Sequence, residues 1–206
     1  MDTSPTVFVV DDDPALRSSL ETLLETAGLR TETYASGREF FDAYDPDRPG
    51  CLVLDLRLRG ESGLEVLDRL RAEGALLPII MLTAHGDVPA SVRALRGGAL
   101  DFIEKPVRPT ALIARIREAL QIDRSTRERH TESAAVQKLA RRLTPREQQI
   151  AALLMAGRRS KEIATALGIG VRTVEGYRAR MLEKMNVSSA AELTAVLIRA
   201  NVVLRA

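Results

Sequence analysis

The chain has 206 residues and a formal net charge of +2, and this length permits one large domain or two small ones. The charge is divided unevenly, because residues 1–121 hold 14 Lys and Arg against 20 Asp and Glu, whereas residues 122–206 hold 16 against 8. A single cysteine, Cys51, excludes an intrachain disulfide and a cysteine-based zinc cluster. No apolar stretch approaches the roughly 18 residues of a membrane helix, and the start lacks the features of a signal peptide. We expect a soluble, cytoplasmic protein without membrane contact, in which an acidic domain precedes a basic one.

Short apolar runs recur through the acidic part and predict buried strands. They cover residues 7–10, 51–54, 78–82 and 100–103, and most of them do not alternate. Such runs are typical of strands that are covered on both faces of a parallel sheet. Residues 31–34 alternate between polar and apolar side chains, as an edge strand does.

Helix start signals lie between these runs. Each is a capping side chain followed by proline or, three residues on, by glutamate: Asp13 before Pro14, Ser36 before Glu39, and Ser62 before Glu65. Asp87 can cap a helix over residues 88–96. The alternation predicts an α/β domain of five (βα) units, with helices on both faces of the sheet and the flavodoxin-like strand order 2-1-3-4-5.

The remainder of the chain is predicted to be mainly helical. A fifth helix begins near Pro109, and its apolar stripe thins out past Gln121, so residues 122–142 predict a charged linker that is partly helical. From Leu143 onward four helices follow, and a short Ile169-Gly170 turn before the third predicts a helix-turn-helix. The expected domains are residues 1–121, a linker over 122–142, and an all-α domain over 143–206.

Five polar residues stand at the carboxyl ends of the predicted strands. They are Asp11, Asp12, Asp55, Thr83 and Lys105. In a parallel sheet these ends meet at one crevice. There each pair of carboxylates repels by about 4 kcal/mol at roughly 4 Å and an effective dielectric near 20, so a cation is needed. Magnesium suits oxygen ligands, and a carboxylate beside it can form an aspartyl phosphate that the lysine and the threonine hydroxyl stabilise. A cis bond between Lys105 and Pro106 would aim the lysine at this crevice.

Motifs around these positions resemble the receiver domain of two-component response regulators. They are Val-Val-Asp-Asp-Asp at 9–13, Leu-Asp-Leu-Arg-Leu at 54–58, Thr-Ala-His-Gly-Asp-Val-Pro at 83–89 and Phe-Ile-Glu-Lys-Pro at 102–106. The resemblance covers residues 5–121, and the third motif is similar to the FixJ subfamily in particular. It implies Asp55 as phosphoacceptor and a Mg²⁺ ion held by Asp11, Asp12, Asp55 and the backbone carbonyl of Arg57. It also implies that Thr83, Phe102 and Lys105 transmit the phosphorylated state.

The receiver motifs contain one departure from the family pattern and two positions that leave the lifetime of the phosphoryl group open. Arg59 stands where the family usually has proline, which favours a more mobile loop after the third strand. Arg57 and His85 occupy positions that, in this family, tune dephosphorylation by admitting or blocking water.

The basic part resembles the LuxR-type four-helix DNA-binding domain over residues 143–200. The matching motifs are Leu-Thr-Pro-Arg-Glu at 143–147, Lys-Glu-Ile-Ala at 161–164, Arg-Thr-Val-Glu-Gly-Tyr at 172–177 and Lys-Met at 184–185. The resemblance implies a recognition helix over residues 171–185 in the DNA major groove. Its expected DNA-binding residues are Arg172, Thr173, Glu175, Gly176, Arg178, Ala179, Arg180 and Lys184. Residues 188–200 resemble the helix through which such domains pair.

The leading hypothesis is a DNA-binding response regulator of the FixJ/NarL type. A partner histidine kinase phosphorylates Asp55, and a phosphorylation-dependent homodimer binds double-stranded DNA. In this hypothesis the protein is a signalling regulator and not an enzyme. One alternative is a protein in which the receiver never uses phosphate and only assembles partners. A magnesium phosphohydrolase is disfavoured, because the haloacid-dehalogenase-like Asp-x-Asp-x-Thr signature is missing after the first strand.

Overall fold

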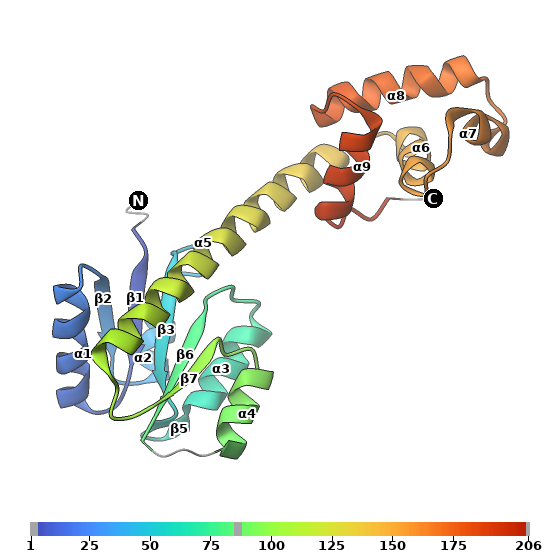
Figure 1. The fold of residues 1–206 in the computed structure, drawn as a ribbon. Coiled ribbons are helices and arrows are strands. Elements are labelled where there is room, and N and C mark those ends of the chain that lie inside the picture. Colours follow the sequence, from blue (N-terminus) through green and yellow to red (C-terminus); the bar gives the residue numbers. More distant parts are fainter. Residues whose placement is uncertain (1–3, 85–87, 205–206) are drawn as a thin grey trace. The chain divides into compact units, whose positions relative to one another are not determined.

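A computed structural model describes residues 4–84 and 88–204 of the chain (Figure 1). The chain divides into two compact units, Met1–Arg127 and Glu128–Ala206, and each is described by itself. Asp87 and His85, which the sequence analysis singled out as a cap and as a residue that tunes dephosphorylation, lie outside the described residues.

The first unit is built on a parallel five-stranded sheet. Its strands, in spatial order, are β2 (Arg30–Tyr34), β1 (Thr6–Val10), β3 (Gly50–Asp55), β6 (Ile79–Thr83) and β7 (Asp101–Glu104). Every neighbouring pair is parallel. The predicted flavodoxin-like order is therefore confirmed. β1, β3 and β6 are buried along their whole length, whereas the edge strand β2 is only partly buried.

Helices cover both faces of this sheet, and each face has its own apolar core (Figure 1). α1 (Pro14–Thr26) and the first part of α5 (Pro109–Ala140) pack on one face. α2 (Gly37–Ala43), α3 (Gly63–Ala72) and α4 (Val88–Arg96) pack on the other. The predicted caps form at α1, α2 and α3, because the side chains of Asp13, Ser36 and Ser62 accept backbone N–H groups of the first turn.

A short hairpin follows β3 and was not predicted. β4 (Arg57–Leu58) and β5 (Glu61–Ser62) pair antiparallel, and Gly60 turns the chain between them with a φ of +85°, a conformation that glycine adopts without steric cost. Glu61 fixes the hairpin to α2 by accepting the Gly37 N–H at 2.7 Å. Where the sequence analysis expected a more mobile loop, the structure has two paired two-residue strands.

Helix α5 does not end near Gln121 but continues to Ala140. Polar contacts hold the continuation, and its last residues, Val136, Leu139 and Ala140, pack on the apolar core of the second unit. In the first unit the buried Asp123 carboxylate accepts from the Gly50 N–H at 2.9 Å and from Arg127 Nε at 2.9 Å. In the second unit the side chains of Ser133 and Gln137 both donate to the Ala200 carbonyl. An apolar stripe could not reveal contacts of this kind, so the sequence predicted only a partly helical linker.

The second unit contains four further helices around one apolar core. They are α6 (Pro145–Met155), α7 (Ser160–Leu167), α8 (Val171–Met185) and α9 (Ala190–Arg199). Thr144 and Glu147 form the predicted capping box of α6. Gly168, at a φ of +65°, ends α7, and the chain enters α8 after a short turn. The helix-turn-helix arrangement predicted from the sequence is therefore present.

Candidate functional site

Three carboxylates meet at the carboxyl edge of the sheet. Asp11 and Asp12 directly follow β1, and Asp55 is the last residue of the adjacent β3. Each of the three offers an oxygen, and these oxygens lie within 4.8 Å of one another. The juxtaposition expected from the strand ends is thus what the structure shows.

Lys105 joins two of these carboxylates. Its Nζ donates to Asp11 Oδ2 at 2.8 Å and to Asp55 Oδ1 at 2.8 Å. The lysine follows β7, and its backbone N–H donates to the Thr83 carbonyl at 2.6 Å, which fixes it beside the end of β6. The Lys105–Pro106 bond is cis, as the sequence analysis proposed.

The remaining expected switch residues lie on the same two strands. Thr83 ends β6 and is 1% exposed. Phe102, in β7, is half-buried and packs against the apolar core shared by α2, α3 and α4. Phe102 therefore lies on the side of the sheet that α2, α3 and α4 cover.

The proton affinities of this group reflect burial and charge together. Burial raises the pKa of the Asp55 carboxyl above its ordinary value, and the hydrogen bond from Lys105 offsets part of that rise. Burial lowers the pKa of the Lys105 ammonium, but the hydrogen bonds to Asp11 and Asp55 outweigh burial, so the net shift is upward. Lys105 therefore stays charged while it holds the two carboxylates.

Asp12 has a different cationic partner. Arg59 Nε lies 3.1 Å from Asp12 Oδ2, and the arginine side chain is 88% exposed. Arg57, two residues earlier, donates its backbone N–H to Asp55 Oδ2 at 3.3 Å. In the sequence, Arg59 stands out only as a departure from the family pattern. No local sequence signal shows that it reaches Asp12, because the contact depends on the β4–β5 hairpin.

The donor set of the crevice fits a divalent cation with a preference for oxygen. Three carboxylates converge, and with the two neighbouring cations, Lys105 and Arg59, the group keeps a net charge of −1. Magnesium takes ligands of this chemistry and commonly keeps waters and phosphate oxygens in its shell. The arrangement can therefore hold Mg²⁺ and present one carboxylate to a phosphoryl group.

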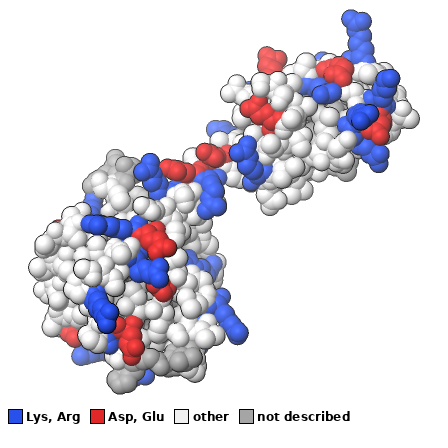
Figure 2. Space-filling model, viewed as in Figure 1, with Lys and Arg blue, Asp and Glu red and all other residues white. Residues whose placement is uncertain are grey.

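In the second unit, one face of α8 is exposed. Val174 and Met181 face the core, whereas the exposed residues are Arg172, Thr173, Glu175, Gly176, Ala179 and Arg180. Figure 2 shows basic side chains, with acidic ones between them, over α7 and the adjoining end of α8. Exposed basic residues also lie just before and at the start of α7: Arg158 and Arg159, which the sequence did not single out, and Lys161, which belongs to the 161–164 motif.

Two side chains that were expected to donate hydrogen bonds to DNA phosphates already have partners within the unit. Arg178 donates to Ser160 Oγ at 2.6 Å and to Glu175 Oε1 at 3.0 Å. Lys184 Nζ donates to Glu147 Oε2 at 2.7 Å, and Glu147 is only 2% exposed. A DNA-binding role for these two side chains stays a prediction.

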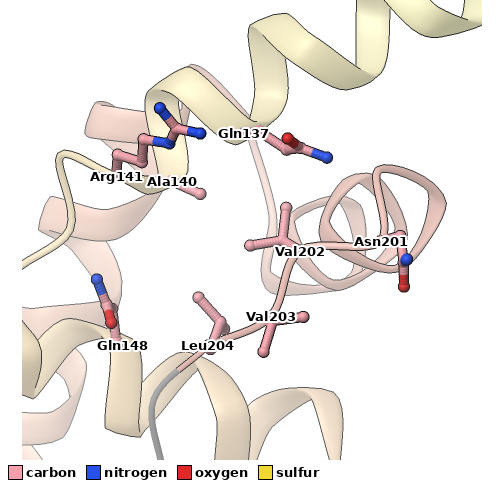
Figure 3. Close-up of a pocket in the computed structure, with 8 residues that line it drawn as sticks. All are labelled: Gln137, Ala140, Arg141, Gln148, Asn201, Val202, Val203 and Leu204. Carbon is pink, nitrogen blue, oxygen red and sulfur yellow. The ribbon is translucent and has the colours of Figure 1, made fainter. Parts of the chain in front are cut away.

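A separate pocket of about 270 Å³ lies where the end of α5 meets the chain after α9 (Figure 3). The described residues that line it are Gln137, Ala140, Arg141, Gln148, Asn201, Val202, Val203 and Leu204. None of these lining residues belongs to the crevice or to α8, and the pocket is not part of the candidate site.

Comparisons with known proteins agree with both halves of this description. Residues 7–117 match the response regulator receiver domain, and residues 141–197 match the bacterial regulatory proteins of the luxR family. The transcriptional regulatory protein FixJ of Azorhizobium caulinodans is 44% identical over 198 residues, which are 95% of this chain and 93% of that protein.

Two solved structures are similar over almost the whole chain. The response regulator StyR is 40% identical, with a TM-score of 0.81 over 95% of this chain and 99% of StyR. Full-length FixJ from B. japonicum is 36% identical, with a TM-score of 0.59 over 98% of this chain and 99% of that one.

The fold and the crevice define a receiver domain that is joined to a helix-turn-helix domain. The chain belongs to the two-component response regulators with a LuxR-type DNA-binding domain, and its relatives place it in the FixJ-like group. It is a DNA-binding response regulator, as the sequence motifs predicted. Within the described ranges, no helix combines the length and apolar character that crossing a membrane requires.

Proposed function

We propose that Asp55 accepts a phosphoryl group from a histidine kinase in the cytoplasm and that its phosphorylation controls transcription. The observation that carries this proposal is the position of Asp55 at the end of β3, where its carboxylate lies close to those of Asp11 and Asp12 and accepts a hydrogen bond from Lys105. Its oxygen attacks phosphorus, a new O–P bond forms, and the bond from phosphorus to the imidazole nitrogen of the donor histidine breaks. The released nitrogen keeps the bonding electron pair and then takes up a proton.

Asp11, Asp12, Asp55 and the Arg57 carbonyl would hold a Mg²⁺ ion, which supplies positive charge beside the phosphoryl oxygens. Lys105 adds a fixed cation, because two hydrogen bonds hold its ammonium at the crevice. The hydroxyl of Thr83 would donate to a phosphoryl oxygen. These groups promote transfer to Asp55, and the slow loss of the phosphoryl group by hydrolysis resets the protein.

The phosphorylated crevice would act on the α4 side of the receiver. We propose that Thr83 and Phe102 carry the change from β6 and β7 to this surface, where Val92 and Leu95 are exposed on α4. Exposed apolar side chains of this kind favour pairing with a second copy. A homodimer formed through α4, β7 and α5 would bring together two DNA-binding domains.

Helix α8 would enter the major groove of double-stranded DNA. Arg172, Thr173, Arg178 and Lys184 would contact phosphates, Arg180 would add positive charge beside them, and Glu175, Gly176 and Ala179 would face the bases. The exposure of most of these residues supports this arrangement. In this proposal residues 1–121 receive the signal, residues 122–142 connect, and residues 143–206 bind DNA.

The experiment adds Mg²⁺ and acetyl phosphate to the full chain and follows its intact mass and its affinity for DNA. We expect a Mg²⁺-dependent gain of one phosphoryl group and tighter DNA binding in the wild type, and neither in Asp55→Asn. Asp42→Asn, which changes an exposed carboxylate on α2, is the matched control and should behave as wild type. Equal behaviour of the wild type and Asp55→Asn would favour a receiver that assembles partners without phosphate. Sustained release of phosphate would favour a hydrolase.

A further inference from the structure

Each of the three crevice carboxylates has a cationic partner among the described residues, but the partners are not equivalent. Lys105 forms ion pairs with both Asp11 and Asp55. Asp12 is paired with Arg59, whose Nε lies 3.1 Å from Asp12 Oδ2. The pairs formed by Lys105 belong to the phosphorylation site as proposed above, and the pair formed by Arg59 has no part in it.

The two cations differ in how firmly they are held. The Lys105 side chain is 19% exposed and donates to two buried carboxylates. The Arg59 side chain is 88% exposed, and its partner Asp12 is 24% exposed. Exposed ion pairs change an equilibrium constant by roughly a factor of five or less. The guanidinium of Arg59 can therefore leave Asp12 while the core and the Lys105 pairs stay in place.

The hairpin explains why an arginine at this position reaches the crevice. Arg59 lies between the paired residues Leu58 and Glu61, next to the turn residue Gly60. The pairing of β4 with β5 and the contact of Glu61 with the Gly37 N–H hold the backbone of the turn beside the strand ends. The long side chain then bridges from the turn to Asp12.

We infer that Arg59 is a counter-ion that Mg²⁺ must displace from Asp12, so this residue sets how much Mg²⁺ the receiver needs. The inference rests on the proposed Mg²⁺ site. A divalent ion on Asp12 and the guanidinium 3.1 Å from the same carboxylate repel each other, because both are positive. Proline, which is usual at this position in the family, carries no charge and cannot compete. Arg59 is therefore a residue that tunes the metal requirement of phosphorylation in this chain.

The test measures Mg²⁺ affinity directly, without phosphorylation. The full chain is titrated with MgCl₂ at constant ionic strength, and the amide NMR signals of residues around Asp12 and Asp55 report the dissociation constant. The variants are Arg59→Gln, which removes the charge at similar size, and Arg59→Lys, which keeps the charge. The matched control is Arg69→Ala on α3, which removes an exposed arginine whose Nε lies 3.0 Å from Glu73 Oε1.

We expect Arg59→Gln to lower the dissociation constant about two- to fivefold. Arg59→Lys should lie closer to the wild type, and Arg69→Ala should equal it. The gain in Arg59→Gln should shrink as KCl is raised, because salt screens exposed charges. An unchanged dissociation constant in Arg59→Gln, or an equal gain in Arg69→Ala, overturns the role of Arg59 while the Mg²⁺ site itself stands. A wild-type chain that shows no saturable Mg²⁺ binding at Asp12 and Asp55 overturns the Mg²⁺ site and the inference together.

Discussion

The buried carboxylate of Asp123 accepts the backbone N–H of Gly50 at 2.9 Å, across 73 residues of sequence. Asp123 lies in the part of α5 beyond the residues that the sequence assigned to the receiver, and Gly50 begins the central strand β3. The same carboxylate pairs with Arg127, which also donates to the carbonyl of Arg48. The extension of α5 is therefore tied to the chain that leads into β3, whose last residue is Asp55.

Replacing Asp123 tests this attachment. Asp123→Ala leaves the Gly50 N–H and the Arg127 guanidinium without their buried acceptor, so we expect a loss of about 2–4 kcal/mol in the free energy of unfolding. Amide hydrogen exchange should become faster over residues 122–127. Glu118→Ala, which removes an exposed carboxylate on the same helix, should change the unfolding free energy by less than about 0.5 kcal/mol. Equal effects of the two variants would contradict the attachment.

The pair formed by Glu147 and Lys184 predicts a pH dependence in the second unit. Burial alone would raise the pKa of Glu147, but hydrogen bonds from Lys184 and Thr144 outweigh it, and the pKa lies below its ordinary value. A carboxyl group whose pKa is lowered by folding stabilises the folded state at pH values above its ordinary pKa. This contribution is lost as the pH falls through the lowered pKa.

Lys184→Met removes the cation from this pair and leaves a buried carboxylate. We expect a loss of about 1–3 kcal/mol near pH 7. The difference from the wild type should shrink as the pH is lowered, because a protonated Glu147 needs no cation. Urea unfolding of the second unit at a series of pH values measures both effects. A difference that stays constant down to acid pH would show that the charge of Glu147 is not its cause.

Gly63, the first residue of α3, has no room for a side chain. A Cβ at this position would lie 2.2 Å from the Asp55 carbonyl oxygen, so the backbone must shift at the end of β3. Gly63→Ala should therefore destabilise the receiver by more than about 1 kcal/mol and slow the gain of the phosphoryl group from acetyl phosphate. The measurement pairs thermal unfolding with the rate of mass gain, and a variant with the wild-type rate would show that Asp55 tolerates the shift.

Gly176, in the middle of α8, offers the opposite case. Apart from the adjacent residues and the backbone of the helix itself, no atom lies within 4 Å of a Cβ built there, and alanine favours a helix over glycine by roughly 1 kcal/mol. Gly176→Ala should thus raise the midpoint of thermal unfolding of the second unit. A lowered midpoint would mean that this face of α8 is covered.

Arg172 tests the orientation of α8 on DNA. Its side chain is exposed in the first turn of the helix. If it contacts a phosphate, Arg172→Ala should weaken DNA binding and reduce the slope of log affinity against log salt by about 1. Arg38→Ala, which removes a 90% exposed arginine from the receiver, should leave the slope unchanged. An unchanged slope in Arg172→Ala would remove this residue from the interface.

Much of the fold was predictable because simple patterns govern it. Short apolar runs without alternating polar residues predicted the central strands. Because the carboxyl ends of parallel strands meet at one edge of a sheet, Asp11, Asp12, Asp55 and Lys105 were expected there together. The helix caps followed from single residues and their spacing.

The features that the sequence did not reveal depend on contacts between distant residues. The extension of α5 is held by polar bonds from Asp123, Ser133 and Gln137, and its last residues pack on the core of the second unit. The approach of Arg59 to Asp12 requires a hairpin of only two residues in each strand. Similarly, the engagement of Lys184 with Glu147 depends on how α6 and α8 pack.

Locating the phosphoryl group on the chain shows whether Asp55 is the phosphoacceptor. The full chain is treated with Mg²⁺ and acetyl phosphate, the aspartyl phosphate is reduced with borohydride, and the peptides are sequenced by mass spectrometry. Reduction converts a phosphorylated aspartate to homoserine, and we expect homoserine at position 55 only in the chain treated with donor and Mg²⁺. Homoserine at Asp11 or Asp12 in place of position 55, or at no position, would contradict this expectation.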